Sequence, residues 1–464
     1  MDEEEINKQL REQNELLKRE NELLKAKIRE LEARLAQYEN AHTPPSLRRG
    51  RNRKIGQDKN LKGNPGQKIG HKGLSRPYAT PDRQVEVTMD LCPDCGAELG
   101  LPFRIDSKII EEIPEPQPIT VTEYKIAHYR CPCCQKEVVA GNSDCPHEGK
   151  FGNNIISLAT LFRYEDRLPH RKIQDALKRL YGLKISPATI LDLTRRAADA
   201  VRSEYDAILN KIRDAPILYV DETSIHVQGE KHWIWTFTTQ SETFFVIRKS
   251  RGMKVLTEVL TRRFKGIIVC DGWKPYAKFT NRLQRCWAHL LRESKDLAEK
   301  FEEAIPLHEA LKALYESVTK ALESDPPPEI RADLWHSARE ALKQWIMKEY
   351  SLEIIQKFIG KISNGFNYWF TFIINPGVEP TNNRAERALR PQVVLRKILG
   401  TLRNEKGTSI HERIMTVLAT WGLKDLDCLQ MLTGKANQLN TYRQCIAVEW
   451  ITKNLLYSRH RYYS

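Results

Sequence analysis

Three acidic residues, far apart in the sequence, lie where they could bind metal ions together. Asp221 and Asp271 each end a run of apolar, β-branched residues that predicts a buried strand, and Glu386 lies one turn into a later helical segment. Buried carboxylates are costly without a compensating cation, and Mg²⁺ prefers oxygen ligands. Two such ions can activate an attacking oxygen and stabilise the leaving one in phosphoryl transfer. A single Asp at a strand end is more often a turn or cap residue, but three acids in this order predict a two-metal site.

A second candidate metal site is built from cysteines. Six of them fall in the segment 92–145, and the chain opens with acidic residues rather than a secretory signal, so metal binding is favoured over disulfides. Two C-x₂-C pairs predict a closed tetrahedral site for a structural Zn²⁺. Cys133 is an alternative ligand, and Cys145 or His147 could substitute for one. The expected ligands are Cys92, Cys95, Cys131 and Cys134.

The charge balance predicts an anionic partner. The formal net charge is +14 and the pI is about 9.2. Residues 43–88 are basic and poor in apolar residues, which indicates a flexible arm that follows DNA phosphates, with a solvated linker as the alternative. No apolar run is long enough to span a membrane, so we expect a cytoplasmic, nucleoid-associated protein. The expected DNA contacts in the arm are Arg48, Arg49, Arg51, Arg53 and Lys54.

Two helical regions would organise the N-terminal half. Residues 1–42 carry Leu or Tyr every seven residues, with Asn at three of the five other core positions, which predicts a parallel coiled coil and hence a homodimer or higher oligomer. Residues 151–213 predict two helices separated by a turn, with Gly182 ending the first and Ser186 capping the second. This pattern fits a helix-turn-helix in which Arg195 and Arg196 face DNA, and it fits an ordinary helical hairpin equally well.

The elements around the acids define the fold class. From residue 214 the pattern is three strands, a helix and a further strand, and a later helix carries Glu386, which is the order of an RNase H-like nuclease core. The predicted class is multidomain α+β. Its segments are a coiled coil (1–42), a basic arm (43–88), a zinc module (89–150), a helical domain (151–213), the core (214–290 and 375–425) with an all-helical insertion (291–374), and a helical tail (426–464).

The order and spacing of several motifs resemble the DDE transposases of insertion-sequence family 66. The motifs are the zipper, the basic segment ending Gly66–Gly73, the two cysteine pairs, Val220-Asp221-Glu222-Thr223, Cys270-Asp271-Gly272-Trp273, Cys286-Trp287-Ala288-His289 and Thr381–Arg387. The resemblance implies catalytic acids at Asp221, Asp271 and Glu386, two Mg²⁺ or Mn²⁺ ions, and transposon ends and target DNA as partners. Elements of this family often encode accessory proteins beside the transposase.

Other residues near the acids have supporting or purely structural interpretations. Arg384 and Arg387 flank Glu386 and suit phosphate binding, or are surface charges. His289 could contact the scissile phosphate or cap a helix, and Asn383 could support the site or only cap the helix of Glu386. Glu222 is expected to be supporting or at the surface. Two alternative functions are a zinc-containing DNA-binding regulator with an inactive nuclease core and a structure-specific RNase H-like nuclease.

Overall fold

The structure is a computed structural model that describes residues 80–146 and 148–438, together with six helical, exposed positions between Glu15 and Leu24. The predicted coiled-coil pairing, the arm residues from Arg48 to Lys54 and most of the C-terminal tail lie outside the described residues. The α+β class is confirmed, because a mixed sheet lies among many helices. Within the described part of the chain, every helix is too short or too polar to cross a membrane.

A six-stranded mixed sheet forms the middle of the molecule. Its order is β5-β4-β3-β6-β7, and β8 pairs with the far end of β3. Strands β3, β4 and β5 are antiparallel neighbours, whereas β6 runs parallel to β3 and β7 parallel to β6. Strands occur at the four positions where the sequence predicts them, and β7 and β8 extend the sheet. Their bounds are β3 Ile217–Val227, β4 Glu230–Thr238, β5 Thr243–Arg248, β6 Ile267–Cys270, β7 Leu283–Arg285 and β8 Thr401–Leu402.

Local sequence explains the long hairpin of β3 and β4. Two residues, Gln228 and Gly229, connect the strands, and both have positive φ, at 53° and 79°. Positive φ at both positions is the geometry of a two-residue turn whose twist matches that of the flanking strands. This hairpin extends β3 well beyond its parallel pairing with β6, which ends at Tyr219 and Val269.

Four helices precede the sheet and share its core. They are α2 Asn153–Tyr164, α3 His170–Tyr181, α4 Pro187–Ala200 and α5 Arg202–Arg213. The predicted turn is confirmed: Gly182 ends α3 with a left-handed φ of 66°, and the Ser186 side chain accepts the Thr189 N–H at the start of α4. One continuous apolar cluster joins these helices to the sheet and to α14, so they pack as part of the same body.

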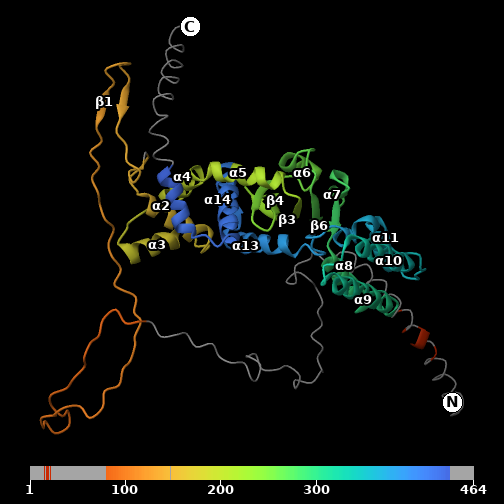
Figure 1. The fold of residues 1–464 in the computed structure, drawn as a ribbon, viewed down its shortest axis with the longest axis horizontal. Coiled ribbons are helices and arrows are strands. Elements are labelled where there is room, and N and C mark those ends of the chain that lie inside the picture. Colours follow the sequence, from red (N-terminus) through yellow and green to blue (C-terminus); the bar gives the residue numbers. More distant parts are fainter. Residues whose placement is uncertain are drawn as a thin grey trace, which may run out of the picture.

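The predicted all-helical stretch is helical throughout, apart from its short connections. It contains α8 Trp287–Ala298, α9 Ile305–Leu322, α10 Pro328–Ile346, α11 Glu353–Asn364 and α12 Thr371–Ile374, with 3-10 turns at Glu302–Ala304 and Phe366–Tyr368. These helices form a second apolar cluster that reaches the sheet through Tyr219 and Val269. Figure 1 shows them at one end of the elongated body, with α2, α3 and α4 at the other.

Four further helices lie between these two groups of helices (Figure 1). They are α6 Met253–Leu260, α7 Lys274–Phe279, α13 Asn383–Leu399 and α14 Glu405–Leu423, and a further helix starts at residue 428. Helix α14 covers the edge strand β5. Its side chains Glu412, Thr416 and Thr420 accept the outward N–H groups of Ile247, Phe245 and Thr243, with donor–acceptor distances of 2.6, 2.9 and 3.1 Å. An edge whose N–H groups are satisfied in this way cannot pair with another chain.

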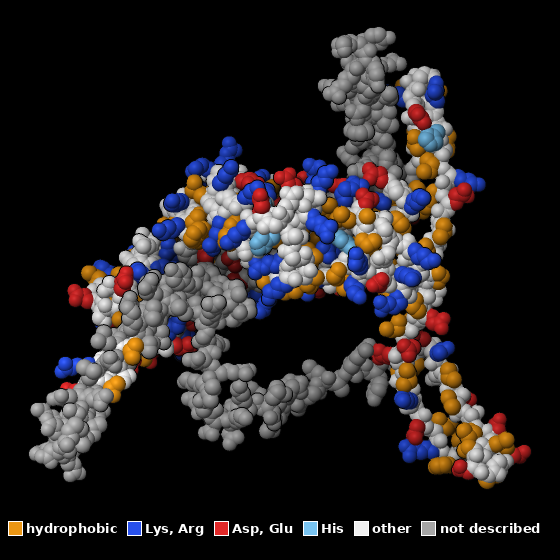
Figure 2. Space-filling view, turned by 180° about the vertical axis from the view of Figure 1, so that it is seen from behind, with side chains coloured by type: hydrophobic (Ala, Val, Ile, Leu, Met, Phe, Trp, Pro, Cys, Tyr) orange, Lys and Arg blue, Asp and Glu red, His pale blue; other side chains and the backbone are white. Residues whose placement is uncertain are grey.

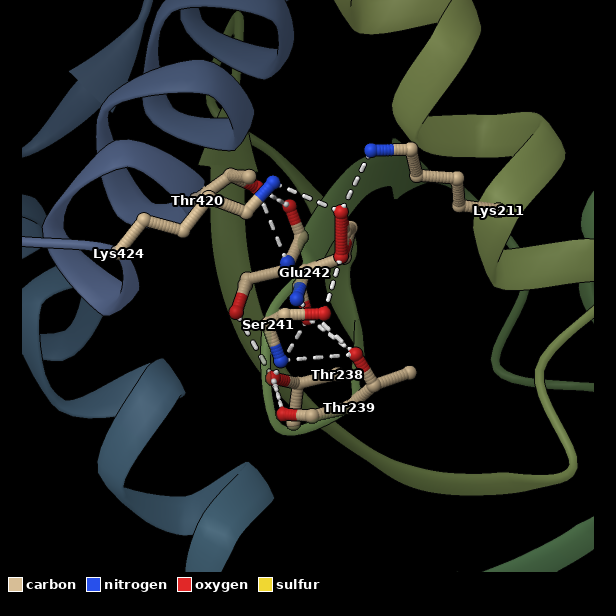
Figure 3. A network of polar contacts seen from close by, with 8 residues as sticks. Lys211, Thr238, Thr239, Ser241, Glu242, Thr420 and Lys424 are labelled. Atoms are coloured by element: carbon tan, nitrogen blue, oxygen red, sulfur yellow. Dashed lines mark hydrogen bonds and ion pairs between the residues drawn. The ribbon is translucent and has the colours of Figure 1, made fainter. Parts of the chain in front are cut away.

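A polar network fastens the turn between β4 and β5 to two helices (Figure 3). The buried Glu242 carboxylate accepts hydrogen bonds from Lys211 of α5 at 2.9 Å and from Lys424, at the end of α14, at 2.8 Å. Ser241 donates to its other oxygen at 2.7 Å. Burial alone raises the pKa of Glu242, but these hydrogen bonds outweigh burial and lower the pKa to about 2.

Glu242 is therefore expected to stabilise the fold at neutral pH and to lose this effect in acid. Its pKa is about 2 in the folded chain and about 4.3 in an unfolded chain, so its contribution is complete above the unfolded value and disappears as pH falls through the folded one. Glu242→Gln should lower the free energy of unfolding by about 1–3 kcal/mol at pH 7, with a difference that shrinks towards pH 3. Urea unfolding followed by circular dichroism measures this, and a pH-independent difference would contradict it.

Candidate active site

The sheet brings two of the predicted acids together. In the parallel register Ile217 pairs with Ile267 and Tyr219 with Val269, so the same register continued two residues further places Asp221 beside Asp271. The prediction that Asp221 ends its strand was wrong, because β3 continues through the hairpin with β4 as far as Val227. Asp221 instead lies where the parallel part of the strand ends, and Asp271 follows β6 directly.

Glu386 reaches the same place from α13, which packs against β3. It lies in the first turn of that helix. Burial raises the pKa of Asp221 well above its usual value, and the neighbouring carboxylates raise it further. These carboxylates are Glu222, Asp271 and Glu386. An oxygen-rich cluster whose charges repel one another in a partly enclosed site fits hard divalent cations, which would compensate the repulsion.

The Asp271 carboxylate is held by its own loop. Asp271 is 4% exposed, and the Trp273 N–H donates to its Oδ1 at 2.9 Å. The Trp273 indole N–H in turn donates to the Arg251 carbonyl oxygen at 3.2 Å, and the Arg251 guanidinium lies 4.4 Å from the Trp273 ring centroid and 4.6 Å from that of Trp233. The guanidinium therefore packs between two indoles beside the loop that carries Asp271.

Glu222 is buried rather than at the surface, which corrects one of its two expected interpretations. Its side chain is fully enclosed on the opposite side of β3 from Asp221, where Arg251 Nε donates to Oε1 at 2.8 Å and the Tyr276 hydroxyl donates to Oε2 at 2.5 Å. Burial and the charge of Asp271 raise the pKa of Glu222 to about 7, although Tyr276 and Arg251 act in the opposite direction. Arg251 and Tyr276 could not be predicted as its partners, because neither lies in a motif.

A buried amide fastens the start of α13 to β3. The Asn382 Nδ2 donates to the carbonyl oxygen of Val220 at 2.9 Å, one residue before Asp221. Asn382 is fully buried and its side chain makes no cap to α13. The expected supporting role was placed on Asn383, which is the first residue of α13, but it is Asn382 that contacts β3. The amide thereby fixes the helix that carries Glu386 against the strand that carries Asp221.

His289 lies against Glu386, and an unexpected thiol completes the group. His289 Nε2 is 3.4 Å from Glu386 Oε1, and these atoms lie with Cys286 Sγ within 4.8 Å of one another. Among the described residues this is the one group of three or more His, Cys, Asp or Glu side chains close enough to share a metal ion. Cys286 stood in a recognised motif but was not predicted as a ligand; its C-x₂-H spacing to His289 was the available signal.

The arginines predicted to bind DNA differ in their surroundings. Arg384 contacts Glu379 at 2.5 Å and its guanidinium lies 5.2 Å from the Tyr219 ring centroid, whereas Arg387 is exposed. Arg195 makes contacts of about 3 Å to three carboxylates, and Arg196 is half-buried beside Gly149. The partners of Arg195 are Glu148, Asp192 and Asp199. A phosphate would have to displace these carboxylates from Arg195, so its DNA contact stays a prediction.

Each half of the predicted zinc site has the same local shape. The Gly96 N–H donates to the Cys92 carbonyl oxygen and the Gln135 N–H to that of Cys131, both at 2.9 Å. Gly96 and Gln135 both have positive φ, at 72° and 57°. Hydrogen bonds from the backbone and thiol of the cysteine three positions on lower the pKa of both Cys92 and Cys131. Whether Cys133 or Cys134 binds a metal together with Cys131 stays a prediction.

The two cysteine turns lie apart in the structure. The second connects the paired strands β1 (His128–Arg130) and β2 (Glu137–Val139), at the far end of a long extended segment from the first (Figure 1). Among the described residues the four thiols do not form one group. A structural Zn²⁺ that joins them stays a prediction.

Comparison with known proteins identifies the family to which this α+β protein belongs. The chain belongs to the transposase IS66 family, whose model matches residues 148–410, more than half of its length, and this confirms the resemblance seen in the motifs. It is also similar to the uncharacterized protein y4qI of Sinorhizobium fredii, with 22% identity over 320 residues. That alignment covers 60% of this chain and 58% of y4qI.

Proposed function

We propose that the protein is a DDE-type DNA transposase, which cleaves DNA at the ends of an insertion sequence and joins the 3′-hydroxyl ends to target DNA. The observation that carries this proposal is the convergence of Asp221, Asp271 and Glu386 from β3, β6 and α13. The strand order β5-β4-β3-β6-β7, with three antiparallel strands followed by two parallel ones, supports an RNase H-like core. The helices between β7 and α13 then form the insertion.

The three acids would hold two divalent cations, Mg²⁺ or Mn²⁺. When bound, such ions activate the attacking oxygen and stabilise the leaving oxygen of an in-line displacement. The chain itself supplies the positions of the ligands. Asn382 holds α13 against β3, and the Trp273 N–H orients the Asp271 carboxylate. These contacts limit the movement of Glu386 and Asp271, as a preorganised site requires.

DNA binding is proposed for the basic parts of the chain. Figure 2 shows Lys and Arg side chains across one face of the central body, interspersed with acidic ones. Arg387 is exposed one residue after Glu386 and suits a phosphate close to the reacting bond. The arm at 43–88, the zinc module and α2–α5 would bind the element ends. The coiled coil at 1–42 would pair two protomers, with accessory proteins as further partners in a cytoplasmic, nucleoid-associated complex.

The experiment uses the full chain and the DNA that flanks its gene, with Mg²⁺ or Mn²⁺. Labelled duplexes that carry the terminal inverted repeats are incubated with the wild type and with Asp221→Asn, and nicked and joined products are separated on denaturing gels. Asparagine keeps the oxygen that accepts the Glu222 N–H at 2.9 Å, so the substitution removes the charge with little change of shape. We expect cleavage at the 3′ ends and joining to a second duplex, with loss of both in the variant.

The other functions predict different products. Cleavage of branched DNA without joining would favour a structure-specific nuclease. DNA binding without cleavage in either metal, by both the wild type and Asp221→Asn, would favour a regulator with an inactive core. Either result would overturn the proposal for the chain acting alone, and adding the accessory proteins of the element to the same assay would test whether they restore cleavage.

A further inference from the structure

We propose that Cys286, His289 and Glu386 form a binding site for a transition-metal cation such as Zn²⁺, which shares only Glu386 with the proposed Mg²⁺ site. The donor atoms are Cys286 Sγ, His289 Nε2 and Glu386 Oε1, all within 4.8 Å of one another. Thiolate and imidazole ligands suit Zn²⁺ and Co²⁺, whereas Mg²⁺ prefers oxygen. This inference concerns metal binding alone and holds whether or not the protein cuts DNA.

The distance between His289 and Glu386 fits two ligands of one ion better than a hydrogen bond. Nε2 and Oε1 are 3.4 Å apart. Two ligands at about 2.0–2.1 Å from a tetrahedral Zn²⁺ are separated by about 3.3 Å. A charge-assisted N–H···O bond is shorter, about 2.7–2.9 Å. Glu386 Oε1 is buried and accepts no hydrogen bond in the structure, so this oxygen lacks the partner that a cation would supply.

The three ligands come from segments that the fold already fixes against each other. Cys286 immediately precedes α8 as its N-cap residue and His289 lies in its first turn, so the start of one helix positions both. The Trp287 N–H donates to the Pro380 carbonyl oxygen at 3.0 Å and the Asn382 N–H to Cys286 Sγ at 3.1 Å. These contacts join the start of α8 to the start of α13. The donor atoms are therefore held in place before any metal binds.

The simpler interpretation treats Cys286 as a buried small residue whose sulfur does no more than accept backbone N–H groups, among them that of Asn382. That role explains the burial of the thiol, with Cys286 1% exposed, but it leaves Glu386 Oε1 buried without a donor. A bound cation satisfies both atoms, while the thiol releases its proton to solvent. Three protein ligands leave a fourth position open.

A Zn²⁺ ion bound here would occupy Glu386 Oε1 and hold it towards α8. Because Glu386 is also a proposed ligand of the Mg²⁺ ions, we expect Zn²⁺ to inhibit any Mg²⁺-dependent reaction that uses Glu386.

The test measures bound metal in the purified full chain. Wild type, Cys286→Ser, His289→Gln and the control Cys428→Ser are equilibrated with Zn²⁺, desalted and analysed for metal content. The same proteins are then titrated with Co²⁺, and the thiolate-to-metal absorption and d–d bands are recorded. All four keep the cysteines of the predicted zinc module, so that module contributes equally. We expect Cys286→Ser and His289→Gln each to lose one equivalent of metal, and Cys428→Ser to match the wild type.

A second measurement distinguishes the loss of a metal ligand from misfolding of the variant. Zn²⁺ should raise the midpoint of thermal unfolding of the wild type more than that of Cys286→Ser or His289→Gln, because a ligand that binds the folded state stabilises it. Equal metal content and equal Zn²⁺-dependent shifts in all four proteins would overturn the site. Asp221→Asn should keep the metal equivalent even if it loses DNA cleavage. A wild type that binds this metal but, after the metal is removed, does not cleave DNA in Mg²⁺ would count against the transposase alone.

Discussion

Asp271→Asn is expected to reduce DNA cleavage by at least about 10³-fold and, in the absence of Mg²⁺, to make the protein more stable. The loss of activity follows from losing a charged ligand of two cations, whose stabilisation of the transition state is worth several kcal/mol. Asparagine keeps the oxygen that accepts the Trp273 N–H. The substitution therefore changes charge with little change in the loop.

The gain in stability follows from the repulsion within the acidic cluster. The charge of Asp271 helps to raise the pKa of Asp221, with burial as the larger cause. A carboxyl whose pKa is raised in the folded state contributes stability that is complete below its unfolded pKa, about 3.9, and is lost as pH rises through the folded value. Removing the charge of Asp271 lowers the pKa of Asp221 towards its unfolded value, and the folded state therefore loses less stability as pH rises. The gain, about 1 kcal/mol, should be largest at neutral and alkaline pH and should shrink in acid.

Thermal unfolding in Mg²⁺-free buffer at pH 8 and pH 5 measures the stability, and end cleavage in Mg²⁺ measures the activity. Asp214→Asn is the control, because Asp214 is an exposed aspartate at the end of α5, outside the cluster. It should change neither quantity appreciably. An Asp271→Asn variant that is less stable at pH 8, or one that still cleaves DNA normally, would show that Asp271 has a structural rather than a metal-binding role.

The acids and the strands could be predicted because their signals are local. Asp221 and Asp271 each follow a run of apolar residues, and both runs form strands as expected. The caps at Gly182 and Ser186 were also predictable, because each is set by the residue itself and its immediate neighbours. The length of β3 could not be predicted from local patterns, because its second half is formed by pairing with β4.

Contacts between distant segments account for most of what the sequence did not reveal. Arg251 binds Glu222 from 29 positions away, and Asn382 binds the Val220 carbonyl oxygen from 162 positions away. No periodicity connects such pairs, and an Asn before a helix normally indicates a cap. The thiol of Cys286 becomes a candidate ligand only when α13 places Glu386 beside it. Glu386 belongs to a different motif from Cys286 and His289, and only the packed sheet and helices bring them together.

Glu412→Ala is expected to lower the free energy of unfolding by about 3 kcal/mol, the largest effect on stability among these substitutions. Glu412 is 8% exposed, and its Oε1 accepts both the Ile247 N–H at 2.6 Å and an Arg248 N–H at 2.8 Å. Burial raises the pKa of Glu412, whereas Arg248 and the Ile247 N–H act in the opposite direction. Truncation would leave a buried backbone donor of β5 unsatisfied and remove one carboxylate from Arg248.

Two matched variants separate the backbone contact from the ion pair. Glu412→Gln keeps an oxygen for the Ile247 N–H and should cost about 1 kcal/mol. Glu258→Gln removes the charge of the more exposed carboxylate, which lies 2.6 Å from Arg248. It should lower the free energy of unfolding by less than about 1 kcal/mol. Urea unfolding of the three variants gives the order. If Glu412→Ala and Glu412→Gln were equally destabilised, the ion pair would dominate and the cover that α14 gives to the β5 edge would contribute little.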